Sequence, residues 1–186
     1  MSPRPDARPR LTVMLATLVS ALAASAGCSA TATMPAPECP TGGSSLIVAQ
    51  SVPSASQVPC FESLPEGWSV SSVDVNQDRS VIRFDSDRAG PGAAILHLDR
   101  TCDVSAAVST ASEFPDAERF DQIEQLAPGF RASRFYRFDG GCVRWDFAFD
   151  HNASATEAVA VGDALRLIPR QELSDRLSET FVGEGL

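Results

Sequence analysis

Three arginines and two aromatic residues lie close together in the second half of the sequence, and their types are suited to binding a ligand. Arg134, Arg137 and Arg144 surround Tyr136 and Trp145. Guanidinium groups stack on aromatic faces and bind carboxylates through two parallel hydrogen bonds. The group is therefore a candidate site for an anionic or sugar ligand. The more ordinary alternative is a solvated ladder of charges, with Arg137 and Arg144 as cross-strand neighbours.

A second candidate is the stretch from Asp74 to Asp85, whose oxygen-bearing side chains alternate as they do in calcium-binding loops. Calcium requires several oxygens that converge from one short loop, which accounts for such alternation. Arg79 stands where these loops carry glycine, and Asp85 replaces their usual glutamate. A calcium-dependent adhesion module is therefore one hypothesis. A polar hairpin turn is the alternative explanation of the same residues.

Asp146 and Asp150 are a third candidate, as the carboxylate pair of a hydrolase acting on cell-wall or lipid substrates. This role requires one of the two carboxyl groups to be buried with a raised pKa. The histidines, His97 and His151, are far apart in sequence and make a poor metal set. The sequence contains no G-x-S-x-G, no H-E-x-x-H and no glycine-rich phosphate loop. We predict no catalytic residue, no metal ion and no cofactor, and an enzyme is the less favoured class.

Five cysteines are an odd number, which is unusual for an oxidised protein. Setting Cys28 aside leaves Cys39, Cys60, Cys102 and Cys142, an even set that indicates disulfides outside the cytoplasm. Three connectivities are possible, and we favour Cys39–Cys60 with Cys102–Cys142. No two cysteines have C-x-x-C spacing, so a redox or zinc motif is not indicated.

The N-terminus has the order of a secretory signal, with an arginine-containing start, an uncharged stretch at 11–26 and small residues before Cys28. The uncharged stretch is short for a membrane-spanning helix, which needs about 20 residues. Ala26 and Gly27 fit a bacterial lipobox, whereas Ser25 stands where an aliphatic residue is usual. We predict a signal peptide at 1–27 and lipidation of Cys28. Ordinary cleavage near residues 24–26, or an uncleaved anchor, are the alternatives.

The remaining chain divides by composition and periodicity. Residues 28–45 are small and proline-rich, and they are expected to form a lipidated tether. Residues 46–182 are expected to form a single domain, followed by a tail at 183–186. Strands are predicted at 46–49, around 70–75, at 80–85 and at 94–99, with weaker ones at 104–108 and 119–126.

The strongest element signal is Asp139-Gly140-Gly141 between two aromatic-rich segments, which predicts a β-hairpin. A two-residue Gly140-Gly141 turn would pair Phe138 with Val143. One face would then carry aromatic and aliphatic side chains, and the other would carry charges. This alternation is typical of a half-buried antiparallel sheet.

The C-terminal part predicts two helices. Ala158, Val161, Leu165 and Ile168 follow at helical spacing, and Pro169 separates them from a second stripe that begins at Leu173 and continues with Leu177 and Phe181. The expected fold class is α+β. It consists of a mostly antiparallel β-sheet with the C-terminal helices packed on its apolar face.

The charge balance restricts the possible partners. The sequence has 15 basic and 24 acidic side chains and a formal net charge of −9. Proteins that bind nucleic acid need a basic footprint to displace counterions, so this class of partner is excluded. Electrostatic docking on anionic lipid is also disfavoured, which leaves the N-terminal lipid as the expected membrane contact.

Several of these features occur together: the imperfect lipobox, the tether, four further cysteines, Leu64-Pro65-Glu66-Gly67-Trp68, and the Asp139-Gly140-Gly141-Cys142 hairpin. In this combination the chain resembles small envelope lipoproteins of actinobacteria. The resemblance covers most of the chain, but its motifs are structural and imply no activity. We therefore expect a non-catalytic binding or accessory domain, lipid-anchored on the extracytoplasmic face of the cell membrane. Its partner would be an unknown envelope protein or small ligand, and a secreted form is the alternative.

Overall fold

The computed structural model describes residues 36–39, 43–126, 128–150 and 153–183, all within one of two compact units, residues 32–186. The predicted signal peptide, Cys28 and His151 lie outside the described residues. Three helices and nine strands follow in the order α1 (Gly43–Ser51), β1 (Gln57–Phe61), β2 (Trp68–Asn76), β3 (Arg79–Ser86), β4 (Gly90–Asp99), β5 (Val108–Thr110), β6 (Glu118–Gln125), β7 (Arg131–Phe138), β8 (Gly141–Ala148), α2 (Thr156–Asp163), β9 (Leu165–Pro169) and α3 (Arg170–Gly183).

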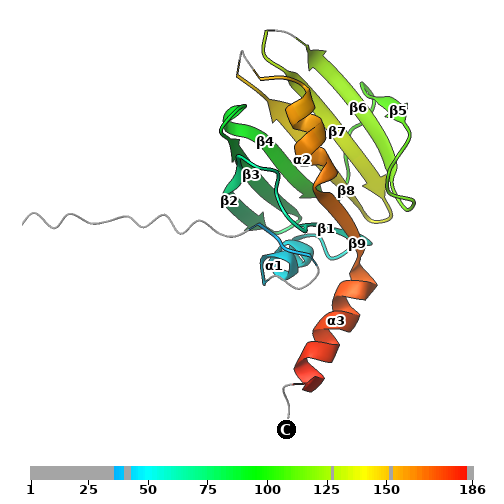
Figure 1. Cartoon of the computed structure of the whole chain (residues 1–186). Coiled ribbons are helices and arrows are strands. Elements are labelled where there is room, and N and C mark those ends of the chain that lie inside the picture. The colour runs from blue at the N-terminus through cyan, green and yellow to red at the C-terminus, as the bar shows by residue number, and fades with distance from the viewer. Residues whose placement is uncertain (1–35, 40–42, 127, 151–152, 184–186) are drawn as a thin grey trace, which may run out of the picture. The chain divides into compact units, whose positions relative to one another are not determined.

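Antiparallel pairing dominates the fold. Seven strands form one sheet in the order β2-β3-β4-β8-β7-β6-β5, and β1 pairs with β9 in a separate two-stranded sheet (Figure 1). Every pairing between these strands is antiparallel. The prediction of a mixed fold with a mostly antiparallel sheet is confirmed. Among the described residues, no helix has the length and apolar character needed to cross a membrane.

The hairpin of β7 and β8 has the predicted faces but a different register. Phe138 lies opposite Gly141, so Val143 pairs with Tyr136 and not with Phe138 as expected. The turn is formed by Asp139 and Gly140, because Gly140 has a left-handed φ of 67°. The predicted register was wrong by two residues, a shift that leaves each side chain on its predicted face.

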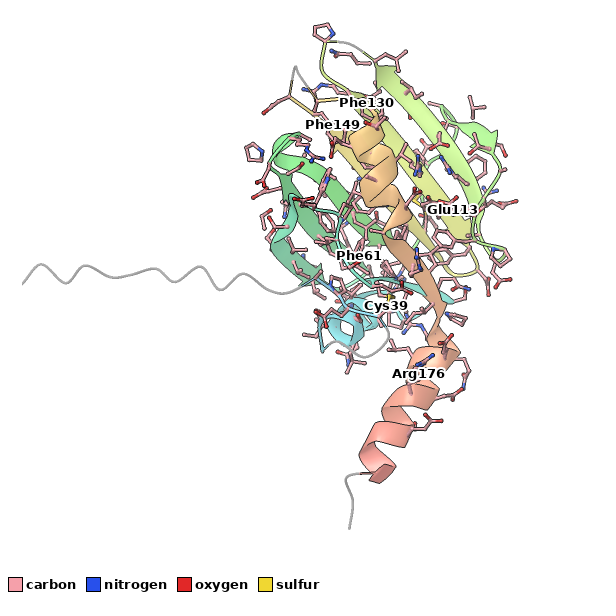
Figure 2. All side chains as sticks on the ribbon, in the orientation of Figure 1. Cys39, Phe61, Glu113, Phe130, Phe149 and Arg176 are labelled. Carbon is pink, nitrogen blue, oxygen red and sulfur yellow. A yellow bond between two sulfur atoms is a disulfide. The ribbon has the colours of Figure 1, made fainter. Side chains whose placement is uncertain are left out.

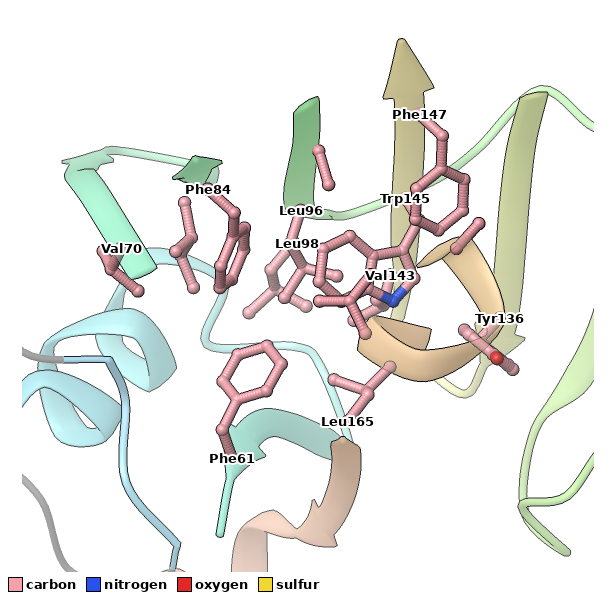
Figure 3. Close-up of a cluster of buried hydrophobic side chains, with 14 of the residues drawn as sticks. Phe61, Val70, Phe84, Leu96, Leu98, Tyr136, Val143, Trp145, Phe147 and Leu165 are labelled. Atoms are coloured by element: carbon pink, nitrogen blue, oxygen red, sulfur yellow. The ribbon is translucent and has the colours of Figure 1, made fainter. Parts of the chain in front are cut away.

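The apolar side chains of the hairpin lie on one face of the seven-stranded sheet, called here the inner face, which also carries Leu96 and Leu98. Trp145 is fully buried at the centre of this core. The rings of Phe61, Phe84 and Phe147 lie 5.2 to 6.0 Å from the Trp145 ring, centroid to centroid (Figure 3). Such contacts add about 0.5–1.5 kcal/mol per pair to the burial itself.

The predicted strand at residues 46–49 is wrong, since this segment belongs to helix α1. Ser45, Val48, Ala49 and Val52 are buried, and their spacing of three, one and three residues is helical. The Ser45 hydroxyl donates a hydrogen bond of 2.7 Å to the carbonyl oxygen of residue 38. The last residues of the predicted tether therefore form the first turn of a packed helix.

The predicted helix through Ile168 is also wrong beyond Asp163. Leu165 and Ile168 lie on strand β9, where they pair with Phe61 and Val58 of β1. The sequence Leu-Arg-Leu-Ile-Pro is compatible with a strand, and pairing with a distant segment overrides the helical spacing. Within the predicted stripe, Ala158 and Val161 of α2 remain helical and belong to the main buried cluster.

Both favoured disulfides are confirmed. Cys39 is bonded to Cys60, and Cys102 is bonded to Cys142. The first bond attaches the segment before α1 to strand β1. The second attaches the segment after β4 to the start of β8, which lies next to β4 in the sheet.

We expect replacement of Cys102 and Cys142 together by serine to lower the free energy of unfolding by about 4 kcal/mol, because the two residues are 40 apart. The same change at Cys39 and Cys60, 21 apart, should cost about 3 kcal/mol. Urea unfolding without reductant measures both values. Four free thiols in the unreduced, unfolded protein would contradict the pairing.

Candidate ligand-binding site

The register of the β7–β8 hairpin separates the five residues of the predicted ligand site. Arg134 pairs with Trp145, and both lie on the inner face together with Tyr136. Arg137 pairs with Cys142, and Arg144 pairs with Phe135, on the opposite, outer face. The predicted cross-strand pair of Arg137 and Arg144 is therefore not formed. The five residues do not surround one site.

The two outer arginines take part in ion pairs, Arg137 with a residue of neighbouring strand β6 and Arg144 with a residue of its own strand β8. Arg137 donates to the carboxylate of Glu118 at 2.6 Å and lies over the ring of Phe120, 5.1 Å from its centroid. The Arg144 side chain lies 3.0 Å from Asp146. Both outer arginines are thus paired with acids, although they are not the cross-strand neighbours of the predicted charge ladder.

Asp146 is held as a carboxylate on the outer face. Its oxygens lie 3.1 Å from His97 Nε2 and accept a hydrogen bond of 2.8 Å from the Ser133 hydroxyl. Burial acts to raise the pKa of Asp146, but His97, Ser133 and Arg144 together lower it below its ordinary value. A proton-donating carboxyl needs the opposite shift. Asp150 is exposed, so neither acid of the predicted pair is a buried carboxyl with a raised pKa.

The predicted calcium stretch is a β-hairpin. Asp74 lies on β2 and pairs across the strands with Val81, and Asp85 lies on β3. The Asp74 carboxylate forms an ion pair with Arg83, and Asp78 in the turn forms one with Arg100. Within the part of the chain that the structure describes, no three histidine, cysteine, aspartate or glutamate side chains gather as a metal site.

The inner face carries a network of charged side chains at its β5-β6-β7 end, which we call the polar network. Asp121 is its centre. The carboxylate of Asp121 accepts hydrogen bonds of 2.9 Å each from Arg134 Nε, Arg119 Nε and Thr110 Oγ1. Arg119 also donates to Glu113 at 3.1 Å, and the Tyr136 hydroxyl donates to Glu113 at 2.6 Å.

Strand register brings these residues together. Asp121 lies opposite Arg134, and Arg119 lies opposite Tyr136, in the pairing of β6 with β7. Thr110 lies opposite Arg119 in the pairing of β5 with β6. Directly opposed residues of an antiparallel pair project to the same face, so all five point to the inner face.

The network keeps its acids ionised. Burial acts to raise the pKa of Asp121, but hydrogen bonds from Arg134, Arg119 and Thr110 lower it below the ordinary value. Burial also acts to raise the pKa of Glu113, but its hydrogen bonds from Tyr136 and Arg119 lower it below the ordinary value. Burial and the bond to Glu113 raise the pKa of Tyr136, which keeps the phenol protonated.

A pocket of about 270 Å³ lies beside the polar network. Its apolar wall consists of Ile123, Phe130, Ala132, Phe147 and Ala158. Its polar end includes Thr110, Arg119, Asp121 and Arg134. Ala158 belongs to α2, and in Figure 2 Phe130 lies near the start of this helix. The pocket thus combines apolar walls with a few convergent polar groups, the usual composition of a small-molecule site.

Helix α2 approaches the network closely. A Cβ atom built on Gly162 would lie 2.6 Å from Arg134 Nη1, so only glycine fits there without displacing the arginine. Figure 2 places Glu113 on the side of α2 toward β6 and β5. Arg134 and Tyr136 were predicted from the sequence as site residues, whereas Glu113, Arg119 and Asp121 were not. Arg119, Asp121 and Ile123 alternate along the sequence, which indicates that they share one face of a strand. Because two of the three are charged, the pattern does not reveal that this face is the inner one.

Comparison with known proteins finds no matching family model, no similar curated protein and no similar solved structure. The site is therefore interpreted from its own geometry.

We expect Asp121→Asn to lower the free energy of unfolding at pH 7 by about 2 kcal/mol, because two half-buried arginines lose a charged acceptor. The folded pKa of Asp121 is lowered, so its contribution is present above the ordinary value near 4 and is lost as the pH falls through the folded value. The difference between the variant and the original protein should narrow from pH 5 toward pH 2, as measured by urea unfolding.

Asp74→Asn is the matched control, since Asp74 also pairs with an arginine but its side chain is 54% exposed. Its loss should stay below about 1 kcal/mol. Equal losses in the two variants, or an Asp121→Asn difference that does not change with pH, would contradict a stabilising polar network.

Proposed function

We propose that the protein is exported, lipidated at Cys28 and held on the extracytoplasmic face of the cell membrane. There it serves as a non-catalytic binding or accessory domain, and the resemblance to envelope lipoproteins of actinobacteria supports this location. Two disulfides support an oxidising compartment, since such bonds are rare in the cytosol. The signal-like N-terminus and the cysteine that remains outside the disulfide set support the anchor.

The observation that carries the binding role is the pocket on the inner face. Its apolar wall faces a polar end made of charged side chains that are already paired with one another. Paired, ionised groups position a ligand well, but they neither accept nor release protons readily near neutral pH. The proposal therefore assigns the pocket to binding, and it assigns no catalytic residue.

The proposal includes a covering role for α2. We infer that α2 closes the apolar face of the sheet over the pocket. Three observations support this role. Ala158 and Val161 are buried in the main cluster, and Ala158 also forms part of the pocket wall. Gly162 approaches Arg134 closely. Leu173 of α3 lies in a separate cluster with Ala49 and Val58, so the proposal gives α3 no part in the pocket.

The anchor is tested by expressing the full chain in a bacterium that processes lipoproteins. We expect the protein in the membrane fraction, with an N-terminal Cys28 whose mass includes acyl chains. Cys28→Ser should move the protein to the soluble fraction, because one thiol carries the whole anchor. The double change of Cys39 and Cys60 to serine is the control and should leave the protein membrane-bound. Full-length protein in the cytosol with its four later thiols free would contradict export.

The binding role is tested with a solvent extract of small molecules from the cell envelope of the host. We expect the extract to raise the Tm of the full protein, because a ligand that binds only the folded state stabilises it. Ala132→Leu adds bulk to the pocket wall and should abolish this rise. Ala153→Leu, which lies outside the pocket lining, is the control. An equal rise in both variants would contradict binding in the pocket.

A further inference from the structure

The polar end of the pocket has more hydrogen-bond donors than acceptors. A guanidinium has five N–H donors and no acceptor, and a carboxylate offers only acceptors. Asp121 already accepts three hydrogen bonds. Arg134 uses only Nε in this network, and its terminal nitrogens have no hydrogen-bond partner among the described residues. Arg134 lines the pocket, and its terminal nitrogens are not fully buried.

The charges of the network do not call for a cation. Arg119 and Arg134 balance Glu113 and Asp121, and both acids are held ionised by their partners. A group that enters this end must therefore supply acceptor oxygens to unused guanidinium donors. Hydrogen bonds from arginine to a carboxylate are charge-assisted and stronger than those to a neutral oxygen.

The opposite side of the pocket is suited to a hydrocarbon body. Phe130, Phe147, Ala132 and Ala158 provide apolar surface without any charged group. A volume of about 270 Å³ accommodates roughly nine groups of water size, at about 30 Å³ each. This number matches a chain of about eight to ten carbons.

Exposed aliphatic side chains continue the apolar surface beyond the pocket. Ile123 lines the pocket and is 60% exposed, and Val108 is 70% exposed. Val108 lies opposite Asp121 in the pairing of β5 with β6, so it projects to the inner face at the edge of the sheet. Isolated exposed side chains are common, but these two lie next to a pocket. They give a longer chain an apolar path out of it.

We propose that the pocket binds an amphiphilic carboxylate, whose head accepts hydrogen bonds from Arg134 and whose hydrocarbon body lies against Phe130, Phe147 and Ala158. The proposal rests on the binding function proposed above and specifies the ligand class. Chains longer than the pocket leave it over Ile123. Cationic amphiphiles of equal length should bind more weakly, because they offer no acceptor to the arginines and the carboxylate of Asp121 is already paired with both of them.

The test is calorimetric titration of the full protein with decanoate, decanol and decyltrimethylammonium, each below its micelle-forming concentration. We expect decanoate to bind most tightly, decanol about tenfold more weakly, and decyltrimethylammonium not measurably. Arg134→Gln should weaken decanoate binding about tenfold and change decanol binding less than about threefold. Arg137→Gln removes an exposed arginine of the outer face and should change neither.

Ala158→Leu narrows the pocket without replacing a charged residue and should abolish binding of both decanoate and decanol. Val159→Leu is its matched control, because Val159 is the adjacent residue of α2 but is 50% exposed and outside the pocket lining. This pair keeps the test decisive if Arg134→Gln does not fold. Decanoate binding that survives in Ala158→Leu, or that is no tighter than binding of the cationic amphiphile, would overturn the proposal.

The two proposals fail in different ways. If the envelope extract raises the Tm while no carboxylate binds, the ligand class is wrong and the binding function stands. If neither the extract nor any amphiphile binds, both proposals fail.

Discussion

A carboxylate on the core side of a sheet is stable only when its charge is compensated, and Asp121 obtains this compensation from Arg119 and Arg134. The compensation requires β5, β6 and β7 to keep their register, because a shift by one residue would move every member of the polar network to the other face. A single half-buried charge thereby fixes the geometry of three strands. It also fixes the polar end of the pocket.

The inner face is divided between two kinds of packing. Around Trp145, aromatic rings from β1, β3 and β8 pack against one another, namely those of Phe61, Phe84 and Phe147. Toward β6 the same face carries ion pairs. Their hydrogen bonds have fixed lengths and directions, so these side chains cannot pack as densely as hydrocarbon side chains do. The pocket lies at this boundary, with Phe147 on one side and Asp121 on the other. A ligand site at such a boundary offers both a hydrocarbon surface and directional donors.

The sequence was sufficient for features that depend on local pattern. Alternation predicted the buried face of β7 and β8, including Trp145, and both disulfide pairings were correct. The sequence was insufficient where contacts with distant segments decide the secondary structure. Leu165 has helical spacing from Val161 but pairs with β1, and Val48 belongs to a helix that begins within the expected tether. Asp121 was missed because a charged side chain ordinarily indicates the solvent face of a strand.

The coupling between Asp121 and Arg134 tests the central claim most directly, because the account makes this half-buried ion pair responsible for the geometry of the β5-β6-β7 end of the inner face. A double-mutant cycle with Asp121→Ala, Arg134→Ala and the double variant, followed by urea unfolding at pH 7, isolates this interaction. The account predicts a coupling free energy of about 1.5–3 kcal/mol, with the double variant more stable than the sum of the single losses implies. Losses that add to within about 0.5 kcal/mol would contradict it.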